Sequence, residues 1–154
     1  MAAMTDFMEN KFIDWFFRGQ AIGITGATAA AGTGPANLYY GLFTSAPTDS
    51  SGGTEVSGGS YTRVGVASSA ANMAATDAAG STANPSAGNT GSTSNNAAIT
   101  FPAMPAATVT HFGAFDALSG GHLLFFGPLT APKVLGAGET PSFAIGAFTF
   151  QIDN

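Results

Sequence analysis

The stretch of sequence that decides the fold is Leu-Tyr-Tyr-Gly-Leu-Phe at residues 38–43. Adjacent tyrosine, phenylalanine and leucine are typical of a β-strand, and the run Ser-Ala-Pro-Thr-Asp at 45–49 follows it as a turn signal. Further strand-like stretches lie at residues 61–66, 98–101, 108–115, 122–126 and 142–152. Turn signals separate the later ones, at residues 117–121, 127–128 and 136–139. Short strands at this spacing predict a mainly β fold, a compact antiparallel β-sandwich or barrel.

One amphipathic helix is expected at residues 5–18, ahead of the strands. Asp6 is the predicted cap, with Glu9 completing a capping box, and Gly19 is the predicted end. Asp14 and Arg18 form an i, i+4 pair on the polar side of this helix. Its apolar side chains are the candidate assembly interface: Phe7, Met8, Phe12, Trp15, Phe16 and Phe17. Two interpretations stay open, packing on the chain's own sheet or docking on a neighbouring subunit.

We expect a single domain over residues 1–154, in which residues 38–68 and 98–153 form the β-domain. Between them, residues 70–97 form a tract of Ala, Gly, Ser, Thr and Asn whose single charged residue is Asp77. Ordering a chain costs about 1–2 kcal/mol per residue, and this tract lacks the apolar bulk to offset that cost. It is therefore predicted to be a long loop or arm that is braced by partners.

Charge and composition exclude several classes of function. Only 8% of residues are charged, and the net charge is −5. The four basic residues are scattered singly, whereas binding to nucleic acid requires clustered cations, so no nucleic-acid partner is expected. The absence of cysteine excludes thiolate catalysis and cysteine-based zinc sites. A surface poor in charge favours packing against neighbouring subunits.

No targeting or membrane segment is expected at the start of the chain. Asp6, Glu9 and Asp14 interrupt its apolar residues, and no basic region precedes them as it would in a signal peptide. No uninterrupted apolar run reaches the roughly 18 residues of a membrane span. We expect a protein made and used without export, with no membrane partner.

Candidate catalytic residues are His111, His122 and Asp116, which would supply a base and the group that orients it. No Gly-x-Ser-x-Gly nucleophile motif accompanies them, so the interpretation as hydrogen-bonded strand residues is favoured. The carboxylates are too dispersed for a metal site. The glycine-rich residues 25–34 miss the spacing of nucleotide-binding loops and are expected to be a linker. We therefore predict a non-enzymatic protein without catalytic, metal or cofactor sites.

Glu55 and Arg63 are a candidate structural ion pair. They flank a glycine-rich segment at residues 50–60 and lie close enough in sequence to meet across a hairpin. Asp49 is a second carboxylate near the same segment. The alternative interpretation is a sugar-binding loop.

The sequence resembles a family of small tailed-phage proteins that are usually labelled phage tail fibre protein. The resemblance rests on Leu-Tyr-Tyr-Gly-Leu-Phe-Thr-Ser-Ala-Pro-Thr-Asp at 38–49, on Thr-Val-Thr-His-Phe-Gly-Ala-Phe-Asp at 108–116 and on Gly-Gly-His-Leu-Leu-Phe-Phe-Gly at 120–127. It covers roughly residues 5–18, 37–68 and 97–153. It implies a structural protein of a bacteriophage virion, assembled in the host cytoplasm.

Two positions on the virion follow as hypotheses. The leading one is a capsid cement, or decoration, protein on the exterior of the shell, in contact with the major capsid protein. The alternative is a tail fibre or tail-tip protein that binds tail proteins and contributes to host attachment through loops such as 44–60. In both, many identical copies share one interface, and a homotrimer is the favoured assembly. An enzyme such as a cell-wall hydrolase is the third and least favoured hypothesis.

Overall fold

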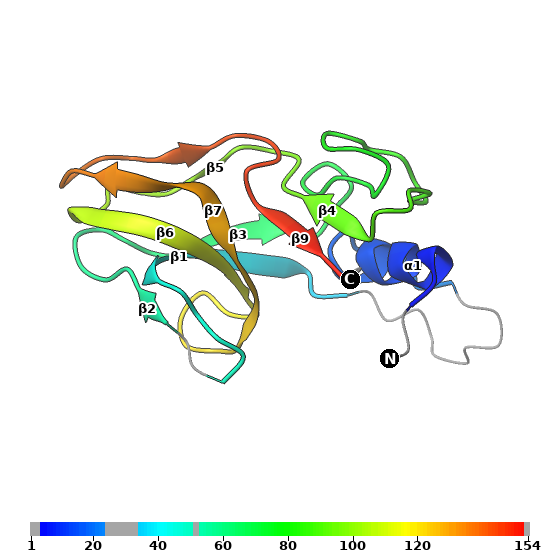
Figure 1. Ribbon diagram of the computed structural model, residues 1–154, viewed down its shortest axis with the longest axis horizontal. Helices are drawn as coiled ribbons and strands as arrows, with labels where there is room; N and C mark the ends of the chain where they lie inside the picture. Colours follow the sequence, from blue (N-terminus) through cyan, green and yellow to red (C-terminus); the bar gives the residue numbers. More distant parts are fainter. Residues whose placement is uncertain (1–3, 24–33, 51–52, 153–154) are drawn as a thin grey trace.

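The computed structural model describes residues 4–23, 34–50 and 53–152, so the glycine-rich residues 25–33 lie outside the described residues. It contains one helix followed by short and long strands (Figure 1). In chain order these are α1 (Asp6–Phe16), β1 (Asn37–Ser45), β2 (Thr54–Glu55), β3 (Val64–Ala67), β4 (Ser92–Ser94), β5 (Ile99–Thr100), β6 (Ala107–Phe115), β7 (Leu123–Leu135), β8 (Ser142–Phe143) and β9 (Thr149–Gln151).

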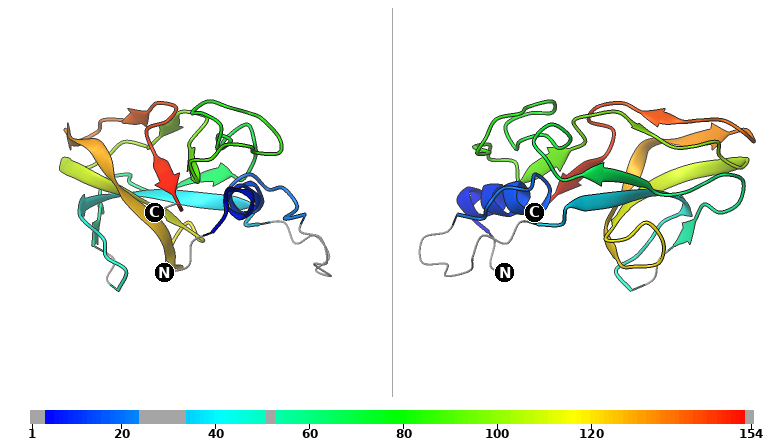
Figure 2. Two further views of the ribbon diagram at one scale, coloured as in Figure 1. Left: turned by 45° about the vertical axis from the view of Figure 1, so that its right-hand side comes forward. Right: turned by 180° about the vertical axis from the view of Figure 1, so that it is seen from behind.

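A five-stranded antiparallel sheet forms the body of the molecule. Its order is β2-β1-β6-β7, and β3 pairs with β1 on the same edge as β2. Two short ribbons, β4–β9 and β5–β8, lie over one face of this sheet (Figures 1 and 2). The predicted mainly β, antiparallel class with one N-terminal helix is confirmed, and the layering is that of a small sandwich.

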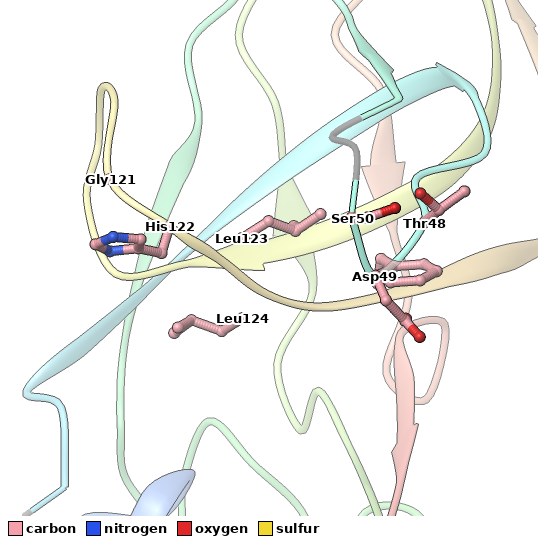
Figure 3. Close-up of a pocket in the computed structure, with 8 residues that line it drawn as sticks. Thr48, Asp49, Ser50, Gly121, His122, Leu123 and Leu124 are labelled. Carbon is pink, nitrogen blue, oxygen red and sulfur yellow. The ribbon is translucent and has the colours of Figure 1, made fainter.

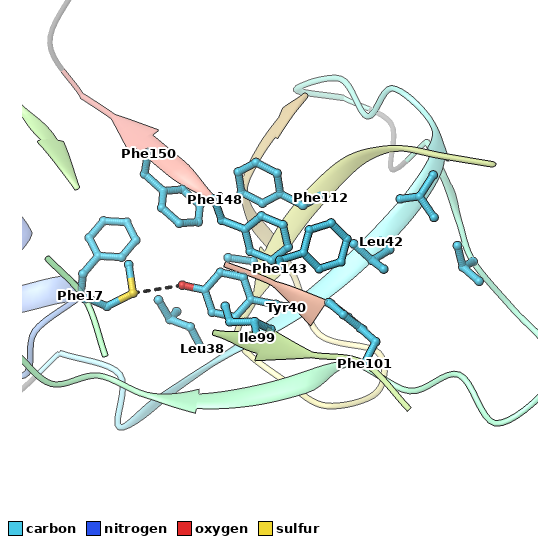
Figure 4. Close-up of a cluster of buried hydrophobic side chains, with 14 of the residues drawn as sticks. Phe17, Leu38, Tyr40, Leu42, Ile99, Phe101, Phe112, Phe143, Phe148 and Phe150 are labelled. Atoms are coloured by element: carbon cyan, nitrogen blue, oxygen red, sulfur yellow. Dashed lines mark hydrogen bonds between the residues drawn. The ribbon is translucent and has the colours of Figure 1, made fainter. Parts of the chain in front are cut away.

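Aromatic rings fill the space between the sheet and the ribbons (Figure 4). The rings of Phe112 on β6 and Phe148 stack with centroids 4.4 Å apart, and Tyr40 on β1 stacks on Phe148 at 5.6 Å. The Tyr40 hydroxyl is fully buried but donates a hydrogen bond to the Met73 sulfur at 3.3 Å. Each buried ring contributes about 1.5–3 kcal/mol by leaving water, so this cluster is the main source of stability.

The strand predicted at residues 142–152 is divided in two. Gly146 has a φ of +78° and interrupts the extended backbone, because this left-handed conformation is open mainly to glycine. The two halves become β8 and β9, which pair with β5 and β4. The prediction of one continuous strand is therefore wrong, and the break is what creates two ribbons.

The turn predicted at residues 127–128 is also wrong. β7 runs through this point to Leu135, with an irregular register opposite Val109 and His111. Proline lacks an N–H group and is tolerated in a strand at an edge or at an irregularity. Pro128 meets both conditions, because β7 is the outer strand of the sheet and its register is irregular next to the pair of His111 and Pro128.

The polar face of α1 braces the residue 70–97 tract. The Asn10 side chain donates to the Gly88 carbonyl at 2.9 Å, and the Thr76 hydroxyl donates to the Asn10 side chain at 2.5 Å. The Ser86 amide and hydroxyl donate to the two Asp14 carboxylate oxygens at 2.8 and 2.6 Å. The bracing that we expected from partners is thus supplied by the chain's own helix.

The ion pair between Asp14 and Arg18 lies in this same contact. Its side chains are 4% and 0% exposed, respectively, rather than lying on a solvated face. The Arg18 guanidinium also donates to the Ser86 hydroxyl at 2.8 Å and to the Ala83 and Met73 carbonyls. The helix spans Asp6–Phe16 and is shorter than the expected residues 5–18. Its N-cap is Thr5 and not Asp6, because the Thr5 side chain accepts from the Met8 amide.

Candidate functional site

The residues of the candidate assembly interface fall into two groups. Phe17 is fully buried, and its ring lies 5.1 Å from those of Phe125 and Phe150. Phe12 and Phe16 are partly buried and pack on the same core. These three pack on the core of the chain itself, and Phe17 has no exposed surface to offer a partner. Met8 and Trp15 are half-buried, and Phe7 is 60% exposed; whether these meet a partner stays a prediction.

Glu55 on β2 and Arg63 before β3 are brought together by the structure. The Arg63 Nε and Nη2 atoms donate to Glu55 Oε1 and Oε2 at 2.9 and 2.8 Å, a two-pronged pair. The same guanidinium donates through Nη1 to the carbonyls of Ala117 and Gly120, at 2.9 and 2.7 Å. Its flat face covers the Phe115 ring at 3.3 Å from the centroid. The pair therefore connects the β1–β3 edge to the turn between β6 and β7.

A tyrosine completes this cluster from the side. The Tyr61 hydroxyl donates to Glu55 Oε1 at 2.8 Å and accepts from the Leu42 amide at 3.0 Å. Burial, chiefly, and the adjacent Glu55 carboxylate raise the pKa of the Tyr61 phenol, which keeps it protonated as a donor. Glu55 thus accepts from two residues and is held firmly in place.

Asp116 and His122, at the two ends of the β6–β7 turn, are in contact. The His122 amide donates to Asp116 Oδ1 at 2.7 Å, and the His122 Nδ1 atom lies 2.9 Å from Asp116 Oδ2. The side-chain hydrogen bond from His122, followed by the amide bond, lowers the pKa of Asp116 below its ordinary value of 3.8. Gly121, at a φ of +69°, lies against this carboxylate so closely that a Cβ atom would collide with it.

Two shallow hollows lie on either side of this turn, and we call this region the loop edge (residues 44–50, 53–60 and 116–126). The first hollow, of about 520 Å³, is shown in Figure 3. Its lining residues are Thr48, Asp49, Ser50, Gly121, His122, Leu123, Leu124 and Phe126. The second, of about 430 Å³, includes Glu55, Tyr61, Arg63 and residues 118–120. Polar side chains beside leucine and phenylalanine are the usual lining of a ligand-binding surface.

The structure brings together two of the three catalytic candidates, Asp116 and His122. His122 pairs with Asp116, but its side chain is 86% exposed, and Figure 3 shows it across the hollow from Ser50. His111 lies on β6, where its Nδ1 atom is 2.9 Å from the neighbouring Thr110 hydroxyl. In the described part of the chain, no group of three His, Asp or Glu residues is placed to hold a metal ion.

The chain matches the family described as Podophage GP4 fiber I protein gp80 over residues 3–151. It belongs to this family. No curated protein matches it. Membership of the gp80 fiber family confirms the resemblance to phage tail-fibre proteins, and with it a structural component of a phage virion. Within the described residues, no helix has the length and apolar character needed to cross a membrane.

Sequence reasoning identified only part of the loop edge of this gp80-family chain. It singled out Asp49, His122 and the Glu55–Arg63 pair. It missed Phe126, which is 39% exposed at the first hollow, because that residue reads as an ordinary strand position. The signal in the sequence was the Gly-Gly pair at 120–121, which predicts a tight turn that folds residues 122–126 back along residues 113–116.

Proposed function

We propose that this chain is a fibre protein of a podophage tail whose loop edge contributes to host attachment. The observation that carries the proposal is the match to the podophage fiber family along residues 3–151. The family description supports the fibre hypothesis over the capsid-cement hypothesis, which rested on a compact, acidic and poorly charged β-domain with a helix and a long arm. The chain would then act by binding and not by catalysis.

The chemistry of the first hollow supports a carbohydrate on the host surface as the ligand. Asp49 and His122 offer polar groups from two loops (Figure 3), and Phe126, a lining residue of the same hollow, offers an exposed ring. Sugars present hydroxyl groups on their rims and apolar C–H groups on their faces, so they pair well with such a mixed surface. The shallow shape suits a ligand that extends beyond a single pocket.

We propose tail proteins and further copies of this chain as its partners. Closed symmetric assemblies are the rule for identical subunits, and a trimer is the form that we favour. The exposed Phe7, at the start of α1, and the poorly charged surface are the features that such contacts would use.

The test is the binding of fluorescently labelled protein to cells of the phage's host. Asp49→Ala, His122→Ala and Phe126→Ala should each weaken binding by at least about threefold without loss of the folded state in circular dichroism. Ile145→Ala is the matched control, because Ile145 is 56% exposed and lies in the β8–β9 connection, outside both hollows. If all three variants bind host cells as the control does, the proposed use of the loop edge is wrong.

A further inference from the structure

We infer that Arg63 is a positioning residue for the loop edge: it presets the 116–122 turn that forms one wall of the first hollow. The inference rests on the proposed function, because it assigns a role within the same binding surface. Arg63 does not line the first hollow. It acts on that hollow through the backbone of the turn.

The geometry of the Arg63 side chain carries the argument. Three of its nitrogen atoms make four hydrogen bonds, two to the Glu55 carboxylate and two to the carbonyls of Ala117 and Gly120. The side chain is only 10% exposed. Because these nitrogen atoms already donate to the protein, Arg63 has little remaining capacity to bind a ligand. Its contacts therefore stabilise the protein itself.

Two adjacent glycines at the tip of the turn give its backbone a freedom that an anchor would restrict. Gly120 and Gly121 have φ values of +63° and +69°, and glycine is the residue with the greatest backbone freedom. The Asp116–His122 contacts fasten only the base of the turn. Arg63 fastens its tip at the Gly120 carbonyl, and both residues line the second hollow and not the first.

Arginine is the residue that can bind the Glu55 carboxylate and the two backbone carbonyls of the turn at the same time. The planar guanidinium contacts the Glu55 carboxylate through Nε and Nη2 and two backbone carbonyls through Nη1. The single ammonium group of lysine cannot make both sets of contacts in this geometry. Glu55 orients the guanidinium, and the Phe115 ring supports its flat face. The position of Gly121 and His122 in the first hollow therefore depends on a residue that lies outside it.

The test compares Arg63→Lys and Glu55→Gln with the wild-type protein by amide hydrogen exchange and by host-cell binding. In Arg63→Lys, we expect exchange of the amides of residues 117–122 to quicken by at least about tenfold, with β1 and β6 amides unchanged. Host-cell binding should fall by a similar factor. Glu55→Gln should produce the same pattern more weakly, because the carbonyl contacts of Arg63 remain.

A charge-swapped variant, Glu55→Arg with Arg63→Glu, separates the ion pair from the turn contacts. It restores opposite charges, but a glutamate at position 63 cannot donate to the two carbonyls, so binding should stay low. Unchanged exchange in Arg63→Lys, or full binding by a folded swap, would overturn the inference. If the hollow variants Asp49→Ala and His122→Ala bind normally, it is the proposed function that fails. If they lose binding while Arg63→Lys keeps it, only this inference fails.

Discussion

The guanidinium carbon of Arg63 lies 3.3 Å from the centroid of the Phe115 ring. Phe115 in turn stacks on Phe43 with an angle of 14° between the rings, so the cation caps a column of two aromatic side chains. Arg63 is thus held by charge from Glu55 and by the ring beneath it. This arrangement lies on the face of the sheet away from the main aromatic core.

The first prediction is that Glu55 and Arg63 stabilise the fold as a coupled unit. Glu55→Gln, Arg63→Met and the double variant form a thermodynamic cycle that is measured by urea unfolding. We expect each single change to cost about 1.5–3 kcal/mol, since charged hydrogen bonds are lost. The coupling free energy should be about 1 kcal/mol or more, as for residues in one network. Additive effects would contradict the described pair.

The second prediction separates the two groups of helix residues. Phe17→Ala should lower the free energy of unfolding by about 3–5 kcal/mol, because a fully buried ring leaves a cavity. Phe7→Ala should change it by less than about 0.5 kcal/mol, because the ring is 60% exposed. Chemical denaturation measures both. Equal effects would show that the placement of α1 is wrong.

The Phe7→Ala protein then tests the assembly prediction. Since its fold is preserved, its incorporation into virions reports on the contact alone. Loss of incorporation would support a partner at Phe7, and normal incorporation would remove this residue from the candidate interface.

The third prediction concerns Arg18. Arg18→Met leaves the Asp14 carboxylate buried without its cation, which should cost about 3–5 kcal/mol. The double variant Asp14→Leu with Arg18→Met should recover part of that loss, because no unpaired charge remains. Urea unfolding and protease cleavage within residues 81–88 are the measurements. A single variant as stable as the wild type would contradict the buried contact between α1 and this tract.

The fourth prediction concerns two glycines that face each other across the sheet. Gly41 pairs with Gly113, and a Cβ atom on Gly113 would lie 2.6 Å from Leu123 Cδ1 and 2.8 Å from Phe43 Cε2. Gly113→Ala should therefore destabilise by about 1–3 kcal/mol through overpacking. Gly136→Ala is the control, because its Cβ would meet Glu139 only at ordinary contact distances. Thermal melts of the two variants should differ clearly.

The fifth prediction is a pH dependence of the β6–β7 turn. The pKa of Asp116 is lowered in the folded protein, mainly by the His122 side chain. The unfolded chain therefore takes up a proton more readily, so the stabilisation is present above the ordinary value of 3.8 and is lost as the pH falls below it. Amide exchange in residues 117–122 should quicken in acid, after correction for intrinsic rates. Asp116→Asn should abolish this dependence; an identical profile in the variant would refute it.

The sequence predicted the strands better than it predicted their partners. The residue types within runs such as 38–43 and 108–115 are enough to predict strands, and the structure places these runs in β1 and β6. The division of residues 142–152 and the passage of β7 through Pro128 depend on pairing with distant strands, which no local pattern contains. For the same reason, the bracing of residues 70–97 by α1 was missed, since Asn10 and Gly88 are 78 positions apart.

The candidate site shows the same division. The Glu55–Arg63 pair could be predicted from the sequence, because its members are eight positions apart and of opposite charge. The contacts of Arg63 with Ala117 and Gly120 were not, because backbone carbonyls carry no signal in the side-chain sequence. Phe126 joins the loop edge only through the register of β7 on β6.

The location of the chain in the virion is the most direct test of its proposed function. A cryo-electron-microscopy reconstruction of the whole phage particle should place the sheet and helix described above in the fibres of the tail, with the loop edge turned outward. Density for this fold on the capsid shell and not in the tail would contradict the account.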